Sequence, residues 1–63
     1  MEWKLIDTVP LDRDLELAVV DNRGINRIAF PCRRLPEIGW LDVETNKQIH
    51  YVCPTHWRDW SLH

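Results

Sequence analysis

Four side chains of this sequence are of the kinds that bind zinc: Cys32, His50, Cys53 and His56. Two thiolates with two imidazoles are a common ligand set for a structural zinc ion. Their spacing is unfavourable, however, because no close pair of ligands is followed by a second close pair. A strand through His50 and Cys53 would also place these two on opposite faces. We therefore expect no metal and no other cofactor, with both cysteines serving as small buried apolar side chains.

The residues around Cys32 also suggest nucleophilic catalysis. Cys32 precedes Arg33 and Arg34, whose charges would lower the pKa of the thiol, and either His50 or His56 would be the base. Only closeness in sequence supports this arrangement, and no signature of a catalytic cysteine accompanies it. A chain of 63 residues is also small for a substrate pocket. We predict that the protein is not an enzyme.

Basic residues are concentrated in the middle of the chain. Residues 1–21 hold six acidic and two basic residues, whereas residues 22–36 hold no acidic residue and four arginines, Arg23, Arg27, Arg33 and Arg34. This basic strip fits two interpretations. It could bind single-stranded nucleic acid with the help of a stacking aromatic ring, from Trp40, Tyr51 or Trp57. It could instead pair with the acidic N-terminal third, within one chain or across a dimer. The formal net charge of −2 disfavours strong binding to a phosphate backbone.

The apolar residues that would position these groups alternate with polar ones. This alternation predicts four strands, near residues 15–20, 25–31, 40–43 and 48–52. Turn-forming residues separate them at 21–24 and 44–47. Pro31 and Pro36 enclose residues 32–35, which predicts an edge or a loop, because proline donates no ladder hydrogen bond. The predicted core consists of Leu15, Leu17, Val19, Ile28, Phe30, Trp40, Ile49 and Tyr51.

The fold class that follows is mainly β. We predict a small antiparallel meander of about four strands, forming either an open sheet or an SH3-like small barrel. The length of 63 residues allows one small domain, spanning residues 1–63. Residues 55–60 fit either a short helical turn near the C-terminus, capped by Thr55, or a fifth strand. A chain of this size buries only about 60% of its unfolded surface, so a partner chain would stabilise it.

Two short motifs near the chain ends, here called the terminal boxes, resemble those of one protein family. The first box, residues 3–10, follows the pattern Trp-x-x-Ile-x-Thr-Ala-Pro with valine in place of alanine, and the second, residues 55–57, is Thr-His-Trp. Both boxes are similar to those of a group of small bacterial and phage proteins of unknown function. The resemblance implies a compact β-rich domain and no particular activity. The matching residues are Trp3, Ile6, Thr8, Pro10, Thr55, His56 and Trp57.

Several departures from the family pattern accompany the match. Residues 12–14 replace an Asp-Gly turn, and residues 58–60 replace the sequence Met-Pro-Leu-Pro that usually follows the second box. Trp3 and Trp57 are large anchors near opposite ends of the chain. We expect them to tie the two termini together across one face of the sheet.

The N-terminal residues lack the basic and apolar regions of a signal peptide, and no segment approaches the roughly 20 apolar residues of a membrane span. We therefore expect a cytoplasmic protein with reduced cysteines.

Four tryptophans and an apolar content of 44% are hard to bury in so short a chain. The favoured interpretation is a non-catalytic interaction module that binds protein, another copy of itself included. The alternatives are a barrel that binds single-stranded nucleic acid through Arg23, Arg27, Arg33, Arg34, Trp40 and Trp57, and a structural zinc-binding domain.

Overall fold

The computed structural model describes residues 2–36 and 39–61. The described backbone forms one antiparallel sheet of seven strands. The elements in chain order are β1 (Lys4–Leu5), the 3-10 helix η1 (Ile6–Thr8), β2 (Leu15–Asp21), β3 (Gly24–Arg27), β4 (Cys32–Leu35), β5 (Gly39–Asp42), β6 (Lys47–Ile49) and β7 (His56–Asp59). The predicted fold class, a mainly β antiparallel structure, is confirmed, and the sheet is open.

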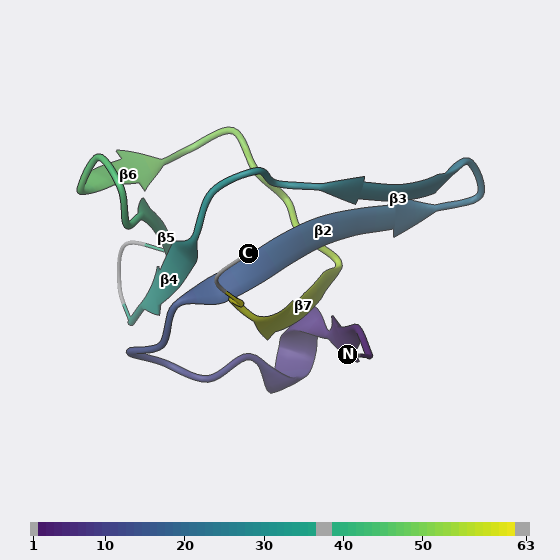
Figure 1. Ribbon diagram of the computed structural model, residues 1–63, viewed down its shortest axis with the longest axis horizontal. Coiled ribbons are helices and arrows are strands. Elements are labelled where there is room, and N and C mark those ends of the chain that lie inside the picture. Colours follow the sequence, from purple (N-terminus) through teal and green to yellow (C-terminus); the bar gives the residue numbers. More distant parts are fainter. Residues whose placement is uncertain (1, 37–38, 62–63) are drawn as a thin grey trace.

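Strand β2 lies at the centre of this sheet. The strand order is β1-β7-β2-β4-β5-β6, and β3 pairs with β2 outside this path. Figure 1 shows the β2–β3 hairpin as an arm that extends away from the rest of the sheet, with β4, β5 and β6 at the other end. The last strand, β7, lies between the first strand and β2. Strands from the two terminal parts of the chain, β1 and β7, are therefore side by side.

The sheet has more strands than the four that alternation predicts, and two of those four, β3 and β6, are shorter than predicted. Residues 56–59 form β7, so the helical turn predicted near the C-terminus is wrong, and the alternative of an additional strand is right. β7 pairs on both sides, with Trp57 opposite Lys4 of β1 and opposite Leu17 of β2. These long-range pairings decide the conformation of a segment whose local propensity is weak. The helical turn of the described chain lies at Ile6–Thr8 instead.

The hairpin of β2 and β3 follows from its turn residues. Asp21 lies opposite Gly24, and the Asp21 carboxylate accepts a hydrogen bond from the Arg23 backbone N–H at 2.8 Å. Gly24 has a φ of 129°, a backbone conformation that residues with a Cβ rarely adopt. β3 ends at Arg27 rather than at residue 31, although the Ile28 N–H still donates to the Leu17 carbonyl at 2.9 Å.

Residues 32–35 form an interior strand, so the prediction of an edge or a loop there is wrong. β4 pairs with β2 through Cys32 and Leu15, and with β5 through four residue pairs that run from Cys32↔Asp42 to Leu35↔Gly39. Pro31 and Pro36 lie just outside the strand, so the ladder loses no donor to them. Pro31 even takes part in the pairing, because its carbonyl accepts the Val43 N–H at 3.0 Å.

The core lies over β2 and agrees with the prediction at most positions. Leu15, Leu17, Trp40 and Ile49 are buried, and Ile28 and Phe30 pack against them while partly exposed. Val19 is only half-buried. Tyr51 is 77% exposed, so its predicted place in the core is wrong. β6 ends at Ile49, the alternation stops there, and Val52 packs against the core instead. The further buried apolar residues are Ala18, Cys32 and Trp57.

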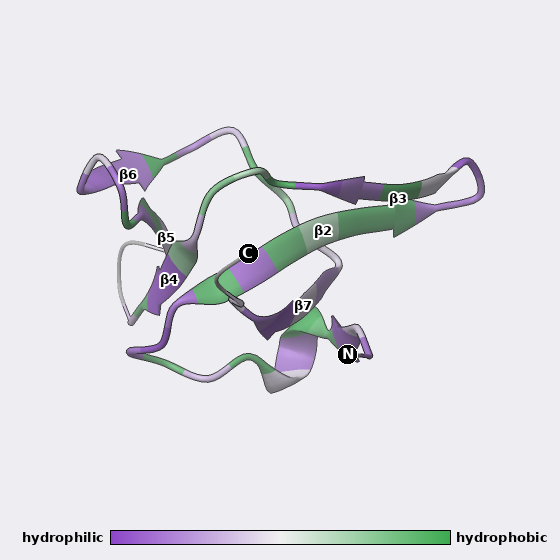
Figure 2. Ribbon diagram, in the orientation of Figure 1, coloured by the Kyte–Doolittle hydropathy of each residue, from purple (hydrophilic) through white to green (hydrophobic). Residues whose placement is uncertain are grey.

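Figure 2 shows β2 as a largely hydrophobic strand with a hydrophilic band near its start. That band corresponds to Glu16, which stands among the apolar residues 15–20. Residues 15–18 are all buried, so both faces of β2 are covered at this point. No helix in residues 2–36 and 39–61 is long and apolar enough to cross a membrane.

Candidate functional site

Glu16 is the one charged residue that is buried in the described part of the chain, with a side chain only 9% exposed. It lies directly opposite Arg58 in the β2–β7 pairing. The Arg58 Nε donates to Glu16 Oε1 at 2.6 Å, and the Arg58 side chain is itself only 20% exposed. A charge-assisted hydrogen bond of this kind offsets the cost of removing a carboxylate from water.

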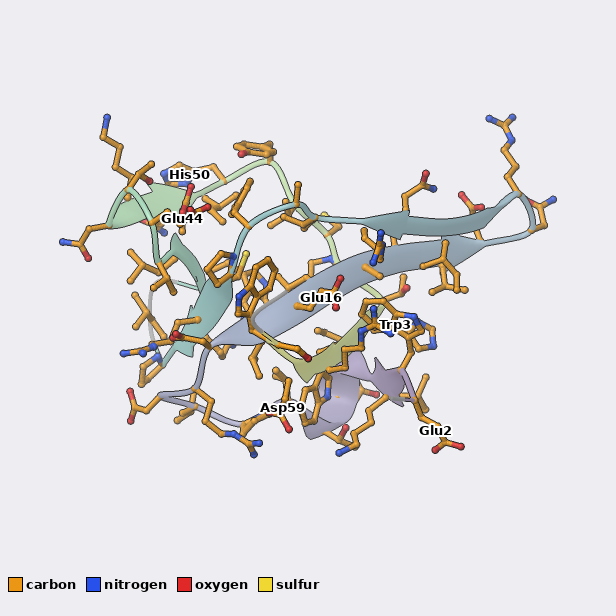
Figure 3. The ribbon with its side chains drawn as sticks, viewed as in Figure 1. Glu2, Trp3, Glu16, Glu44, His50 and Asp59 are labelled. Carbon is orange, nitrogen blue, oxygen red and sulfur yellow. The ribbon has the colours of Figure 1, made fainter. Side chains whose placement is uncertain are left out.

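Two further side chains extend this pair across the sheet. The Arg58 guanidinium carbon lies 4.1 Å from the centroid of the Trp3 ring, within the range of a cation–π contact. On the other side, Arg27 Nη1 lies 3.5 Å from Glu16 Oε2, at the long limit of a hydrogen bond. Figure 3 shows Glu16 at the middle of β2 and Trp3 on the N-terminal segment near β7. We call Trp3, Arg58, Glu16 and Arg27 the charged row.

A groove of about 420 Å³ lies beside the charged row. Glu16 contributes to it from β2, residues 25–29 contribute from β3 and the segment after it, and Trp60 contributes from the segment after β7. Trp60 is fixed there because its backbone N–H donates to the Asp14 carbonyl at 3.1 Å. The groove therefore combines an aromatic ring, aliphatic side chains and an ion pair.

The four predicted zinc ligands do not come together. Cys32 is buried in β4, whereas His50 and Cys53 are exposed in the segment between β6 and β7. His56 lies in β7, where its Nδ1 is 2.8 Å from the Thr55 hydroxyl. No group of three His, Cys, Asp or Glu side chains in residues 2–36 and 39–61 is placed to hold a metal ion. The exposure of Cys53 also contradicts its predicted role as a buried apolar side chain, a role that Cys32 does fill.

The environment of Cys32 is the opposite of that of a catalytic thiol. Burial, and then the charge of Asp42 on β5, raise the pKa of Cys32 to about 12. The adjacent arginines do not reverse this effect. Arg33 bonds to the Asp14 carboxylate at 2.6 Å, and the Arg34 guanidinium stacks on the Trp40 ring at 5.3 Å. The expectation that these arginines would lower the pKa of the thiol is therefore wrong.

The basic strip is divided among several contacts rather than forming one surface. Arg27 contacts Glu16 and Arg33 bonds to Asp14, so two of its arginines pair with the acidic N-terminal third within the chain. Arg34 stacks on Trp40, and Arg23 is exposed at the tip of the β2–β3 arm. Pairing with the acidic third, one of the two predicted interpretations, is thus observed for Arg27 and Arg33.

Two of the tryptophans proposed for base stacking lie in the core. Trp40 is 7% exposed and Trp57 is 4% exposed, so neither offers a ring face to a base. The candidate Tyr51 is exposed. The half-buried tryptophans of the described chain are Trp3 and Trp60.

The terminal boxes lie in contact through the pairing of β1 with β7, edge to edge within the sheet. The Trp57 indole N–H lies 3.1 Å from both the Leu5 carbonyl and the Thr8 hydroxyl. The Ile6 N–H donates to the Thr55 carbonyl at 3.0 Å, and the Thr55 hydroxyl accepts the Val20 N–H at 2.8 Å. Each box thus satisfies polar groups of the other.

The outer edge of β3 is the second candidate site. β3 pairs with β2 alone, and all four of its residues are exposed. Ile25 on this strand is 53% exposed, opposite Val20 of β2. Because the Ile28 N–H bonds to β2, the alternation of an antiparallel ladder directs Gly24 and Asn26 towards β2 as well. The backbone groups of Ile25 and Arg27 therefore point outwards.

Comparison of the chain with protein-family models, with curated proteins and with solved structures finds no significant match. The resemblance of the terminal boxes to a bacterial and phage family therefore stays a prediction.

Sequence reasoning missed Glu16, Arg58 and Trp60 as site residues. A glutamate inside an apolar strand was the available signal, since such a residue is buried only with a partner.

Proposed function

We propose that this chain is a non-catalytic interaction module that binds protein by adding a strand to the outer edge of β3, and that its partner is a second copy of the chain. The observation that carries the proposal is the open edge of β3 on a projecting arm (Figure 1). Exposed edges are templates for strand addition unless a protein protects them.

The other edges of the described sheet are protected in ways that β3 is not. β1 has only two residues and begins with Lys4. β6 has three residues and begins with Lys47. Short strands and lysines are common devices against unwanted pairing. β3 has four residues and holds neither lysine nor proline, and the charge of Arg27 lies against Glu16 of its own chain.

The edge of β3 is complementary to itself. Outward backbone groups on Ile25 and Arg27 are symmetric about Asn26. A two-fold axis through Asn26 would therefore place Ile25 of one copy opposite Arg27 of the other and form four backbone hydrogen bonds. In this register no two arginines lie directly opposite each other, and each Ile25 packs on the aliphatic stem of an arginine. The two arms would form one continuous sheet.

The proposal is tested by sedimentation velocity over a range of protein concentrations, with two matched variants. Ile25→Lys places a charge on the β3 edge, and Tyr51→Lys places the same charge at an exposed apolar position outside the arm. We expect the unaltered chain and Tyr51→Lys to dimerise and Ile25→Lys to stay monomeric. A monomer of 7.6 kDa at every concentration, or a dimer that Ile25→Lys leaves intact, would contradict the proposal.

Salt separates this proposal from nucleic-acid binding. Apolar and backbone pairing at β3 is nearly independent of salt, whereas binding to phosphates weakens steeply as salt rises. Burial of Trp40 and Trp57 removes two stacking rings from the nucleic-acid alternative. Salt-sensitive binding of a single-stranded oligonucleotide, lost in Arg23→Gln, would favour that alternative. The proposal places the module in the cytoplasm, in keeping with its two free thiols.

A further inference from the structure

We propose that the groove between Trp60 and residues 25–29 binds a carboxylate that is attached to a flat apolar group. The inference uses side chains on the face of the sheet that carries Glu16, whereas the proposed strand pairing uses the outward backbone groups of β3, although Ile25 and Arg27 belong to both. It rests on three properties of the groove: the sharing of Glu16 between two guanidinium groups, the position of Arg27, and the ring of Trp60.

The Glu16 carboxylate of the groove is shared between two guanidinium groups. Glu16 and Arg27 are the charged residues of the groove lining, and Arg58 bonds to Glu16 from beside it. Arg58 makes the shorter contact with Glu16, at 2.6 Å against 3.5 Å for Arg27. An anionic ligand would therefore be attracted to the charge of Arg27, which Glu16 compensates less closely.

Arg27 is the group that would take the ligand. Arg58 is held by a 2.6 Å bond to Glu16 and by the Trp3 ring, whereas the contact of Arg27 with Glu16 is long, at 3.5 Å. The Arg27 side chain is 59% exposed, so its planar fork of donors can reach an incoming group. A guanidinium binds a carboxylate through two parallel hydrogen bonds, because its N–H donors lie in one plane at the spacing of the two carboxylate oxygens.

Trp60 gives the groove its apolar selectivity. Trp60 and Ile25 line the same space as Arg27. The side chain of Ile28 instead packs on the core, which lies on the other face of β2. An aromatic ring attached to the carboxylate would pack on Trp60 and Ile25 while the carboxylate meets the guanidinium. The chemical class of the ligand is therefore an aromatic acid, either a free small molecule or the last residue of a peptide with its terminal carboxylate.

Titration by NMR tests the inference, with the Trp60 indole N–H signal as the readout. The probes are benzoate, its neutral analogue benzamide, inorganic phosphate, and N-acetylphenylalanine as a mimic of a peptide C-terminus. We expect benzoate to bind with a dissociation constant of about 1 mM or below, and benzamide to bind at least about tenfold more weakly. Tighter binding of N-acetylphenylalanine than of benzoate would support the inference with a peptide as the source, and the reverse would support it with a free acid.

Two variants place the binding on Arg27. Arg27→Gln should weaken benzoate binding about tenfold or more, whereas Arg23→Gln, an exposed arginine at the tip of the arm, should leave it unchanged. Because Arg27 is largely exposed, its replacement leaves the fold intact, which the remaining NMR signals verify. Equal binding of benzoate and benzamide, tighter binding of phosphate than of benzoate, or unaltered binding to Arg27→Gln would each overturn the inference.

Discussion

Trp57 donates its indole N–H towards Thr8, with 3.1 Å between Nε1 and the threonine hydroxyl, so the last strand is fastened to the first turn of the chain. The same nitrogen lies 3.1 Å from the Leu5 carbonyl, and the Thr8 hydroxyl donates to that carbonyl at 2.7 Å. Lys4 adds a cation–π contact, with its ammonium 4.9 Å from the Trp57 ring. The buried ring of Trp57 thus joins the first and last strands of a chain whose hydrophobic core is small.

Replacing Trp57 by phenylalanine should therefore destabilise the fold. The variant loses the indole donor and part of a side chain that is 4% exposed. We expect the free energy of unfolding to fall by about 2 kcal/mol or more, measured by urea denaturation. Trp60→Phe is the control, because Trp60 is less buried, and its loss should stay below about 1 kcal/mol. Equal losses of unfolding free energy in the two variants would show that the contacts of the Trp57 indole add no particular stability.

The Glu16–Arg58 pair should matter more for stability than an exposed ion pair. Glu16→Gln removes the carboxylate charge to which Arg58 bonds, and the Arg58 side chain is only 20% exposed, so we expect a loss of about 1–3 kcal/mol. Asp14→Asn breaks the Arg33–Asp14 pair, whose side chains are 40% and 44% exposed, and should cost below about 1 kcal/mol. Chemical denaturation of both variants gives the comparison. A loss that is the same in both would mean that burial of Glu16 has no special effect.

Cys32 should make stability depend on pH above neutrality. Its pKa in the folded chain is raised to about 12, from an ordinary value of 9.0. Between these values the unfolded chain releases the proton while the folded chain keeps it, so stability falls as pH rises from 9 towards 12. Near pH 10 to 11 the slope attributable to this thiol should approach about 1.4 kcal/mol per pH unit.

The measurement is the difference in unfolding free energy between the unaltered chain and Cys32→Val at a series of pH values. Valine is apolar and fits a buried position, so it removes the titrating group with little change in character. The alkaline loss of stability should be smaller in Cys32→Val than in the unaltered chain. Cys53→Val, at an exposed thiol, should keep the full slope. Parallel curves for all three proteins would be evidence against the raised pKa.

A side chain at Gly24 should destabilise the fold, for a reason that lies in the backbone alone. A Cβ built at this position would meet nothing within 4 Å, but the φ of 129° is unfavourable for any residue with a Cβ. We expect Gly24→Ala to cost about 1 kcal/mol or more in thermal unfolding. Asn46→Gly, at a φ of 59° in the β5–β6 turn, should be neutral or stabilising. The opposite order of the two effects would contradict this assignment of strain.

The local part of the fold can be predicted from the sequence, because it depends on neighbouring residues. The alternation of Leu15 and Leu17 identifies both the central strand and its buried face, and Asp21 with Gly24 identifies the hairpin turn. The position of β7 between β1 and β2 has no comparable local signal, since it depends on pairing between the two ends of the chain. The prediction that Tyr51 lies in the core is wrong because nothing in the alternation shows that β6 ends at Ile49.

The candidate site was harder to predict than the core. The charged row needs the register between β2 and β7, which places Arg58 opposite Glu16. Without that register, Arg27, Arg33 and Arg34 look like one basic surface, although they contact Glu16, Asp14 and Trp40 respectively. Spacing along the chain therefore identifies the residues that carry charge, and strand order decides which charges meet.

The most direct test of the central claim, self-association through β3, is a disulfide across the proposed two-fold axis. Asn26→Cys in a Cys53→Ser background would place two thiols on directly opposed residues, about 4.5 Å apart between Cα atoms, which suits a disulfide. Gln48→Cys in the same background is the control on another edge strand. Mild oxidation followed by mass spectrometry should give a linked dimer for Asn26→Cys at protein concentrations where Gln48→Cys stays unlinked. Equal or absent linking in the two variants would contradict the account.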